Sequence, residues 1–311
     1  MIVMRFDQFS TCERLFMEGG QFFHVCTKAI ETDVFFRSEE EMNLALNAIA
    51  IAVFMSGCRL LAFAVMSNHF HFIIESSQEV CEAFFMAFKS HLVKCMTRVE
   101  TKKLLKTCKA NLISIDNLRQ LRDEIAYVVR NPFVARNNVN MFAYRWCSGY
   151  LYFNDVMPLF QPGGKASEMT IDDRRVFMKS RSPEVDSRIM VLDGIALPAC
   201  FVDYSRAESF FENARDFQHN LLKNVESQIS IAKRIGDTFT LDDHELWDVV
   251  FRICRNTYRV EGPKQLSPEN RVALARSLKY DYNASNAQIA RCLGILRSAV
   301  DQIFPMSARS K

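Results

Sequence analysis

The chain has 311 residues, of which 49% are hydrophobic, so it is long enough for two domains that each bury a core. Its net charge of +3 does not by itself indicate a nucleic-acid partner. No apolar run approaches the roughly 18 residues that span a bilayer, and the first ten residues lack the apolar stretch of a signal peptide. We therefore expect no membrane partner and a cytoplasmic location. The ten cysteines form no Cys-x-x-Cys pair, which favours buried thiols over a zinc site or disulfides.

The first 160 residues show the pattern of an α+β domain. Alternating apolar residues predict strands, and apolar residues at helical spacing predict helices. The predicted elements are a strand at 22–27, a helix at 38–55, a hairpin of strands at 60–66 and 69–76, a second helix at 80–100 and a final strand at 150–154. Strand, helix, hairpin and helix make up most of a ferredoxin-like antiparallel sheet with helices.

Two histidines stand two residues apart within the second strand of the predicted hairpin. Because side chains alternate across a strand, His69 and His71 lie on one face, and Phe70 and Phe72 lie on the other. Two neighbouring imidazoles indicate a metal site. The alternative is a strand with polar residues on its solvent face. Glu75 shares the histidine face and is a reserve candidate for a ligand.

A helix predicted at 117–130 carries a second group of polar residues. Tyr127 and Asn131 are four residues apart near its end, so both side chains can point the same way. We expect the helix to end at Asn131, because a residue that precedes a proline is pushed out of the α region.

Together the two segments resemble the paired signature of a known enzyme family. Residues 64–75, AVMSNHFHFIIE, and residues 127–135, YVVRNPFVA, are similar to the motifs of REP-associated and insertion-sequence-type single-tyrosine transposases, which are HUH endonucleases. That family's first motif usually reads Met-Pro-Asn-His-hydrophobic-His, and Ser67 stands where proline is common. Besides these two motifs, the order of elements over residues 15–155 agrees with the family.

The resemblance implies a role for each residue of the two motifs. His69 and His71 would be metal ligands, Asn131 would take the position of the third polar ligand, and Tyr127 would be the nucleophile. The cofactor would be a divalent metal, Mg²⁺ or Mn²⁺. The implied reaction cleaves and rejoins single-stranded DNA beside a hairpin through a 5′-phosphotyrosine. The family often works as a homodimer.

The chemistry of phosphodiester cleavage needs these residue types together. A divalent ion offsets the charge that develops on the phosphate and orients it for in-line attack. A tyrosine hydroxyl supplies a nucleophile whose covalent intermediate keeps the bond energy available for rejoining.

Local charge favours a nucleic-acid partner. Residues 80–145 contain twelve Lys or Arg and five Asp or Glu. These basic residues form a candidate phosphate track, whereas the alternative is an ordinary solvated helix face. The candidate DNA contacts in this half of the chain are Lys89, Lys94, Arg98, Lys102, Lys103 and Arg130, with Lys106 and Lys109 adding to the charge.

A turn-prone linker at 161–164 closes the predicted catalytic domain, residues 1–160. It is not a nucleotide-binding P-loop, because Ala166 follows Gly164-Lys165 where serine or threonine is needed. Residues 161–240 are predicted to be a mainly helical connecting region, with an extended piece at 190–197 and its longest helical stretch at 206–234.

The last domain, residues 241–311, is predicted to be all-α with a helix-turn-helix. Ser285 and Gln288 form a capping box, Gly294 makes the turn, and Ser267 with Pro268 starts a supporting helix. Leu296 stands where serine or threonine often caps the recognition helix, so the alternative is a helical bundle that does not bind DNA. The candidate contacts to duplex DNA are Arg291, Arg297, Ser298 and Gln302.

The leading hypothesis is therefore a single-strand DNA transposase with a C-terminal helix-turn-helix. One alternative is a replication initiator or relaxase, which commonly carries an appended helicase or a second tyrosine one turn away from the first, and neither is evident in this chain. The other alternative is a regulator that has lost catalysis and binds DNA through the helix-turn-helix alone.

Overall fold

The computed structural model describes residues 10–28, 34–135, 142–156, 163–179, 184–222, 225–236, 241 and 243–305. The chain is an α+β protein with a small antiparallel sheet and many helices, as the sequence predicts. It divides into two compact units. The first unit comprises residues 1–132, 139–222 and 235–237, and the second comprises 133–138, 223–234 and 238–311.

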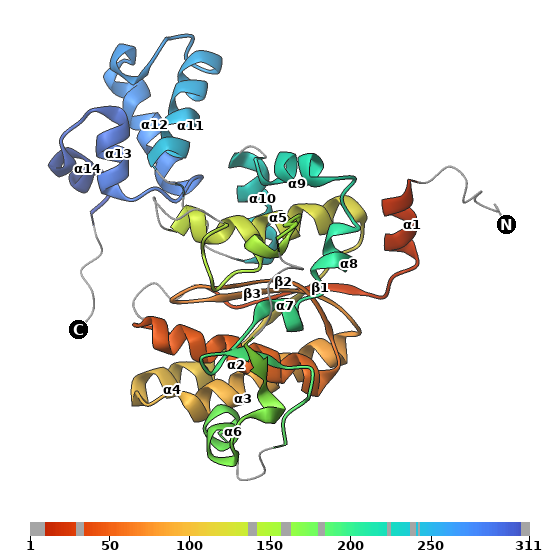
Figure 1. Cartoon of the computed structure of the whole chain (residues 1–311). Helices are drawn as coiled ribbons and strands as arrows, with labels where there is room; N and C mark the ends of the chain where they lie inside the picture. Colours follow the sequence, from red (N-terminus) through yellow and green to blue (C-terminus); the bar gives the residue numbers. More distant parts are fainter. Residues whose placement is uncertain are drawn as a thin grey trace. The chain divides into compact units, whose positions relative to one another are not determined.

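The first unit is built around a four-stranded antiparallel sheet with the order β2-β3-β1-β4 (Figure 1). Its strands are β1 (Phe22–Cys26), β2 (Arg59–Val65), β3 (Phe70–Glu75) and β4 (Asn111–Ser114). The first three strands confirm the predicted strand and hairpin. The strand predicted at 150–154 is wrong, because a 3-10 turn at Gly149–Leu151 and a left-handed residue, Phe153 at φ 50°, interrupt that segment. The fourth strand comes from Asn111–Ser114 instead.

Helices cover both faces of this sheet. Helices α2 (Glu39–Ser56) and α3 (Gln78–Cys95) lie on one face and α5 (Leu118–Ala135) on the other (Figure 1). All six residues of β3 are therefore buried. The alternative of a strand whose histidine face is exposed to solvent does not hold. Phe84, Phe85 and Phe88 of α3 belong to the core.

The helix predicted at 80–100 is two helices. After α3, Met96 adopts an extended conformation with ψ 142°, and α4 runs from Val99 to Thr107. The change of direction after Cys95 could not be read from the sequence, because apolar residues continue at helical spacing across it.

The prediction that the tyrosine helix ends at Asn131 is also wrong. Helix α5 continues through Pro132 to Ala135. Pro132 has no N–H to donate to the Val128 carbonyl, which would ordinarily leave that oxygen without its helical bond. The Cys147 thiol lies 3.9 Å from this oxygen and 3.8 Å from the Val129 carbonyl, so its one S–H is shared between the two acceptors. A side chain from outside the helix thus helps to compensate for the missing bond.

The segment between residues 163 and 222 packs on the same core as the sheet. It contains a small three-stranded sheet and four short helices, and the extended piece predicted at 190–197 is its β6-β7 hairpin. The elements are β5 (Gly164–Lys165), α6 (Ile171–Met178), β6 (Met190–Leu192), β7 (Ile195–Ala196), α7 (Pro198–Phe201), α8 (Tyr204–Glu208) and α9 (Ala214–Leu221). Residues 206–234, predicted as one long helical stretch, are divided among α8, α9 and α10 (Val225–Ile235). The predicted three-part division of the chain stays a prediction.

The side chain of Phe210 packs this segment against the core of the first unit. This side chain is fully buried, meets the Phe22 ring edge-to-face at 5.5 Å and lies under the Arg206 guanidinium at 4.6 Å. Phe210→Ala should lower the free energy of unfolding by about 3–5 kcal/mol, measured by urea denaturation. The control Met55→Ala removes a side chain that is 70% exposed and should change it by less than about 0.5 kcal/mol. Equal effects of the two variants would contradict this packing.

The second unit has its own apolar core, formed by residues such as Leu246, Leu274, Ile289, Leu293 and Val300. Besides α10, its helices are α11 (Asp243–Asn256), α12 (Pro268–Tyr280), α13 (Asn286–Leu293) and α14 (Arg297–Ile303). The predicted capping box at Ser285 is confirmed, as is the cap of α12 by Ser267 with Pro268 behind it. Gly294 ends α13 with φ 63°, a conformation that glycine adopts without strain. That α13 and α14 act as a DNA-binding helix-turn-helix stays a prediction.

Within the part of the chain that the structure describes, every helix is too short or too polar to cross a membrane.

Candidate active site

Three elements of the first unit bring the predicted catalytic residues together. Strand β3 carries His71, with His69 directly before it, and helix α5 carries Tyr127 and Asn131. Strand β1 adds His24, whose Cα partner on β3 is Ile73. Because His24 and His71 are diagonal neighbours on adjacent strands, their side chains share the sheet face that α5 covers.

Asn131 bridges the two histidines of the motif. Its amide nitrogen lies 3.2 Å from His71 Nε2, and its amide oxygen lies 3.3 Å from His69 Nε2. His69 is 7% exposed and His71 is fully buried. The structure thus places the three predicted metal ligands in direct contact with one another.

Tyr127 packs against this cluster. Its ring centroid is 5.6 Å from that of His71 and 6.3 Å from that of His24, in edge-on arrangements. The tyrosine is 2% exposed. The predicted nucleophile therefore lies beside the predicted metal ligands, although the two motifs are more than fifty residues apart in the sequence.

A buried chain of hydrogen bonds leads from Glu124 to Asn131. Glu124 Oε2 lies 3.1 Å from His24 Nδ1, His24 Nε2 lies 3.0 Å from His71 Nδ1, and His71 Nε2 meets the Asn131 amide. Glu124 and His24 are both fully buried. Because a carboxylate only accepts hydrogen bonds, His24 Nδ1–H donates to Glu124, and its bare Nε2 accepts from His71 Nδ1–H.

This direction of hydrogen bonds leaves a lone pair on His71 Nε2. His69 has an oxygen acceptor at each ring nitrogen, the Asn68 side-chain oxygen at 2.8 Å from Nδ1 and the Asn131 oxygen at 3.3 Å from Nε2. When the single N–H of the neutral ring is on Nδ1 and donates to Asn68 at the shorter distance, Nε2 carries the lone pair. The Nε2 atoms of both histidines then lie against the Asn131 amide group, whose nitrogen is next to His71 and whose oxygen is next to His69. Two nitrogen atoms and one neutral oxygen form a donor set that fits a divalent cation with open positions for further ligands.

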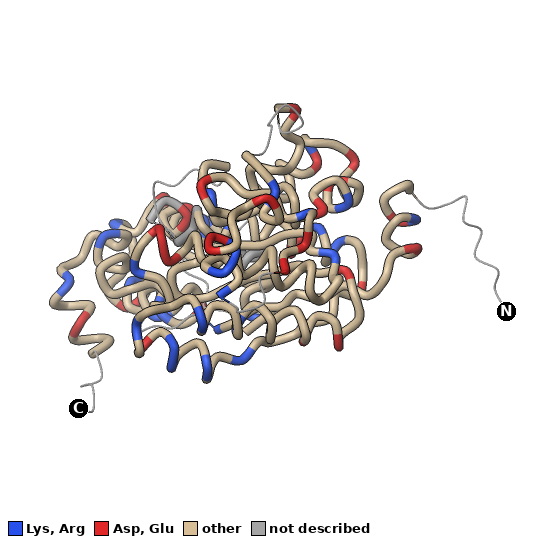
Figure 2. The backbone as a smooth tube through the Cα atoms, turned by 60° about the horizontal axis from the view of Figure 1, so that its bottom comes forward, with Lys and Arg blue, Asp and Glu red and all other residues tan. Residues whose placement is uncertain are grey.

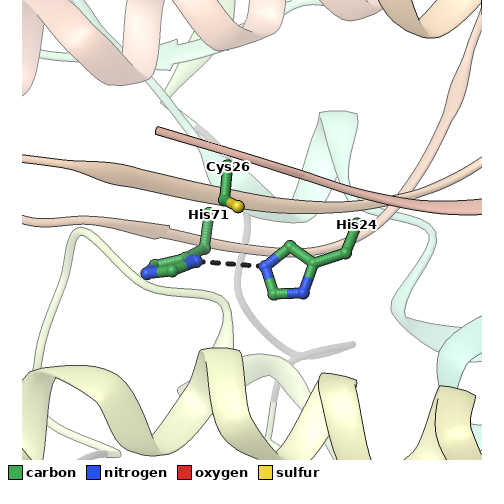
Figure 3. Close-up of side chains that lie close together, drawn as sticks. All are labelled: His24, Cys26 and His71. Carbon is green, nitrogen blue, oxygen red and sulfur yellow. Dashed lines mark hydrogen bonds between the residues drawn. The ribbon is translucent and has the colours of Figure 1, made fainter. Parts of the chain in front are cut away.

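Cys26, His24 and His71 form a second group of side chains that could bind a metal ion. Ligand atoms of His24, Cys26 and His71 lie within 4.8 Å of one another, and all three residues are buried (Figure 3). In this structure the Cys26 thiol donates to the Ile235 carbonyl at 3.7 Å, while the two imidazoles bond to each other. The His24–Cys26–His71 group would take the Nδ1 of His71, whereas the His69–His71–Asn131 group takes its Nε2.

Glu75, the reserve ligand, is engaged elsewhere. Its carboxylate accepts two bonds of 3.0 Å from Arg206 and one of 3.2 Å from Arg59. Burial raises the pKa of this carboxyl, but the hydrogen bonds from Arg206 and Arg59 outweigh burial and hold the pKa below its ordinary value. Glu75 therefore serves as the centre of an ion-pair cluster in the first unit.

The predicted phosphate track is uneven in its exposure. Figure 2 shows basic positions interspersed with acidic ones, and a row of basic positions along the lower edge of the view. Lys94, Lys103, Lys106 and Lys109 are exposed, and Lys102 is partly exposed. Lys89 donates to the Cys108 carbonyl at 3.1 Å. Arg98 pairs with Glu41 at 2.9 Å, and Arg130 is 8% exposed, so these two reach solvent much less.

The candidate contacts in the second unit are all exposed: Arg291, Arg297, Ser298 and Gln302. Arg297 lies 3.7 Å from Asp301, one turn along the same helix. Exposure of these residues on α13 and α14 is what contact with a DNA groove requires.

Two residues of the site were missed from the sequence. His24 is an isolated histidine on another strand, and no spacing connects it with the motif. Glu124 could have been found, because Glu124, Tyr127 and Asn131 follow one another at helical spacing and so share one face of α5.

Comparison with protein-family models, with curated proteins and with solved structures gives no match for this chain.

Proposed function

We propose that the chain is a single-tyrosine DNA transposase of the HUH type, which cleaves and rejoins single-stranded DNA beside a hairpin. The observation that carries the proposal is the meeting of the two motifs. Asn131 contacts both histidines, and Tyr127 packs on His71, so nucleophile and cation ligands share one site.

The order of the strands supports the proposal. A ferredoxin-like sheet built from a strand, helix, hairpin and helix has its first and third strands in the centre, and the sheet order β2-β3-β1-β4 agrees with that arrangement. In this arrangement the two central strands, β1 and β3, carry the histidines, and α5 lies over them with the tyrosine.

The reaction is a transesterification at phosphorus. The Tyr127 oxygen forms a bond to the phosphorus, and the bond between phosphorus and the 3′ oxygen breaks. Tyr127 loses its hydroxyl proton, and the departing 3′ oxygen gains one, so charge is balanced. The reverse reaction with another 3′-OH rejoins the strand.

The chain's own residues prepare this step by orientation. His69, His71 and Asn131 would hold the divalent cation, Mg²⁺ or Mn²⁺, which when bound offsets charge on the phosphate oxygens. Helix α5 fixes Tyr127 and Asn131 one turn apart, so the attacking oxygen and the ligand keep a set separation. Contact of the phosphate with the cation side of the site would then place the phosphorus near Tyr127.

Single-stranded DNA would follow the exposed lysines on and after α3 and α4. Phosphate contacts of this kind give affinity without sequence preference and weaken as salt rises. A homodimer is part of the family resemblance and stays a prediction for this chain.

The test uses a pool of DNA single strands that each contain a short hairpin with randomised flanks. Incubation of the full chain with this pool and Mn²⁺ should give a protein–DNA adduct that survives a denaturing gel. EDTA should prevent it. Sequencing the DNA in the adduct would then identify the cleavage site.

The outcome also separates the alternatives. An adduct that forms on hairpins and is resolved by strand joining supports a transposase, and one that persists without joining favours an initiator or relaxase. Specific binding of duplex DNA with no adduct from any strand favours the regulator and overturns the proposal.

The proposed duplex contact of the second unit can be tested at Arg297. If Arg297 reads a base edge, Arg297→Ala should weaken binding of the preferred duplex by about 1–3 kcal/mol and change the salt dependence little. The variant should fold normally, because a surface pair such as Arg297–Asp301 contributes little stability. Arg291→Ala is the comparison: a phosphate contact should weaken all sequences alike and reduce the salt slope by about one. Unchanged duplex binding in both variants would contradict a targeting role of α13 and α14.

A further inference from the structure

The buried pair of Glu124 and His24 lies behind His71, on the side away from Asn131. Both residues are fully buried, and each is joined to the next group by a hydrogen bond of 3.0–3.1 Å. A hydrogen bond between His24 Nε2 and His71 Nδ1 joins this pair to the proposed cation site. Burying a carboxylate costs free energy unless the carboxylate is well hydrogen-bonded, so a buried Glu124 indicates a specific role for this pair.

We propose that Glu124 and His24 are positioning residues that fix the tautomer of His71, so that its Nε2 lone pair faces the cation. The inference rests on the proposed function for the identity of the cation as Mg²⁺ or Mn²⁺. Ligand histidines generally have the second ring nitrogen held by an acceptor, which orients the ring and increases its basicity. In this chain the acceptor is another imidazole, His24, and the carboxylate of Glu124 lies one step further away.

The order of donors makes the proposal specific. The carboxylate can only accept, so a proton must sit on His24 Nδ1, and none is then available on neutral His24 Nε2. That bare nitrogen requires a proton on His71 Nδ1. The charge of Glu124 thus determines, through two rings, which nitrogen of His71 carries the lone pair that can bind a cation.

Because of Gln120, the single substitution Glu124→Gln should reverse the direction of the hydrogen bonds between residue 124, His24 and His71. The amide nitrogen of Gln120 donates to the Ser114 carbonyl at 3.1 Å and to Glu124 Oε1 at 3.0 Å, and its amide oxygen accepts from the Asp116 N–H at 3.2 Å. The orientation of the Gln120 amide is therefore fixed. In the variant Glu124→Gln, the new amide oxygen must face the Gln120 donor, so the new NH₂ group faces His24 Nδ1.

The reversal then passes along the chain. His24 Nδ1 becomes an acceptor, His24 Nε2–H donates to His71 Nδ1, and the proton of His71 moves to Nε2. A protonated Nε2 cannot bind a cation. Glu124→Gln has nearly the same shape as the native residue, so the change concerns protons more than packing.

The experiment measures the tautomer and the cation separately, on the full chain without DNA. With ¹⁵N-labelled histidine, NMR of the metal-free protein should show His71 protonated on Nδ1, and Glu124→Gln should show it protonated on Nε2. Electron paramagnetic resonance of added Mn²⁺ should give a dissociation constant about 10–100-fold higher for the variant.

His91 supplies the matched control. It is a buried histidine of α3 whose Nε2 donates to the Phe177 carbonyl at 3.1 Å. Burial lowers the pKa of His91 to about 4, so the His91 ring is neutral at pH 7. His91→Gln should leave both the His71 tautomer and the Mn²⁺ dissociation constant unchanged.

The results separate the positioning role of Glu124 and His24 from the transposase function. The positioning role of Glu124 and His24 is overturned if wild-type His71 is protonated on Nε2, if Mn²⁺ does not bind, or if Glu124→Gln binds Mn²⁺ with wild-type affinity. If Glu124→Gln does not fold, the wild-type tautomer alone decides. If the tautomer and Mn²⁺ results are as expected but the protein forms no DNA adduct, the positioning role of Glu124 and His24 is supported and the transposase function is overturned.

Discussion

Replacing Tyr127 by phenylalanine should abolish the covalent protein–DNA adduct and leave hairpin binding intact. The substitution removes one oxygen from a ring that packs against His71 and His24, so the fold and the cation ligands keep their places. Without the hydroxyl there is no atom to form the bond to phosphorus. The adduct is measured on a denaturing gel with labelled hairpin DNA, and binding is measured by gel shift in Mn²⁺.

Tyr152→Phe is the matched control for the loss of a buried tyrosine hydroxyl. Tyr152 is also buried in the first unit, and its hydroxyl donates to the Leu61 carbonyl at 2.6 Å. This variant should lose about 0.5–1.5 kcal/mol of stability and still form the adduct. An adduct that persists in Tyr127→Phe would show that another residue attacks the phosphorus. Loss of the adduct in both variants would show that the effect is not specific to Tyr127 and would contradict the assignment.

Much of the first unit follows from local patterns. The strand at 22–26, the hairpin and the helix that starts at Glu39 have clear periodicity, and their bounds differ from the predictions by only a few residues. The short strand Asn111–Ser114 was missed, because four residues give too little alternation to recognise. Its place in the sheet depends on pairing with β1, which is a tertiary contact.

The helix that carries the tyrosine shows a different limit. A proline usually ends a helix in sequence-based reasoning, because it removes one hydrogen bond and crowds the preceding turn. Helix α5 continues past Pro132, and the Cys147 thiol contacts the carbonyl that the proline leaves without a donor. No rule about the residues near 132 could have included a cysteine fifteen positions later.

The candidate site was predicted where its residues belong to motifs and missed where they do not. His69, His71, Tyr127 and Asn131 come from two short segments with recognisable spacing, and the structure places them together. His24 joins them only because β1 pairs with β3 in one register. The structure excludes the alternative of a solvent-exposed histidine face, which the sequence left open because an alternating strand looks the same whether solvent or a helix covers its polar side.

The last prediction compares the two histidines of the motif, which the structure places in different surroundings. His69→Ala and His71→Ala should each reduce adduct formation below detection, even at high Mn²⁺, because each removes one of only two imidazole ligands. Their effects on stability should differ. His71 is fully buried and donates to His24 Nε2 at 3.0 Å, so His71→Ala leaves a buried acceptor unpaired and should cost about 1–3 kcal/mol.

His69→Ala leaves the hydrogen bonds between Glu124, His24 and His71 in place, and it should therefore be less destabilising than His71→Ala. The exposed His219 on α9 serves as the control, since His219→Ala should change neither the adduct nor the urea unfolding curve. Equal loss of stability in the two site variants would contradict the buried chain of hydrogen bonds. Adduct formation by either variant would instead contradict the cation site, because a single remaining imidazole with Asn131 is too weak a ligand set to hold the ion against water.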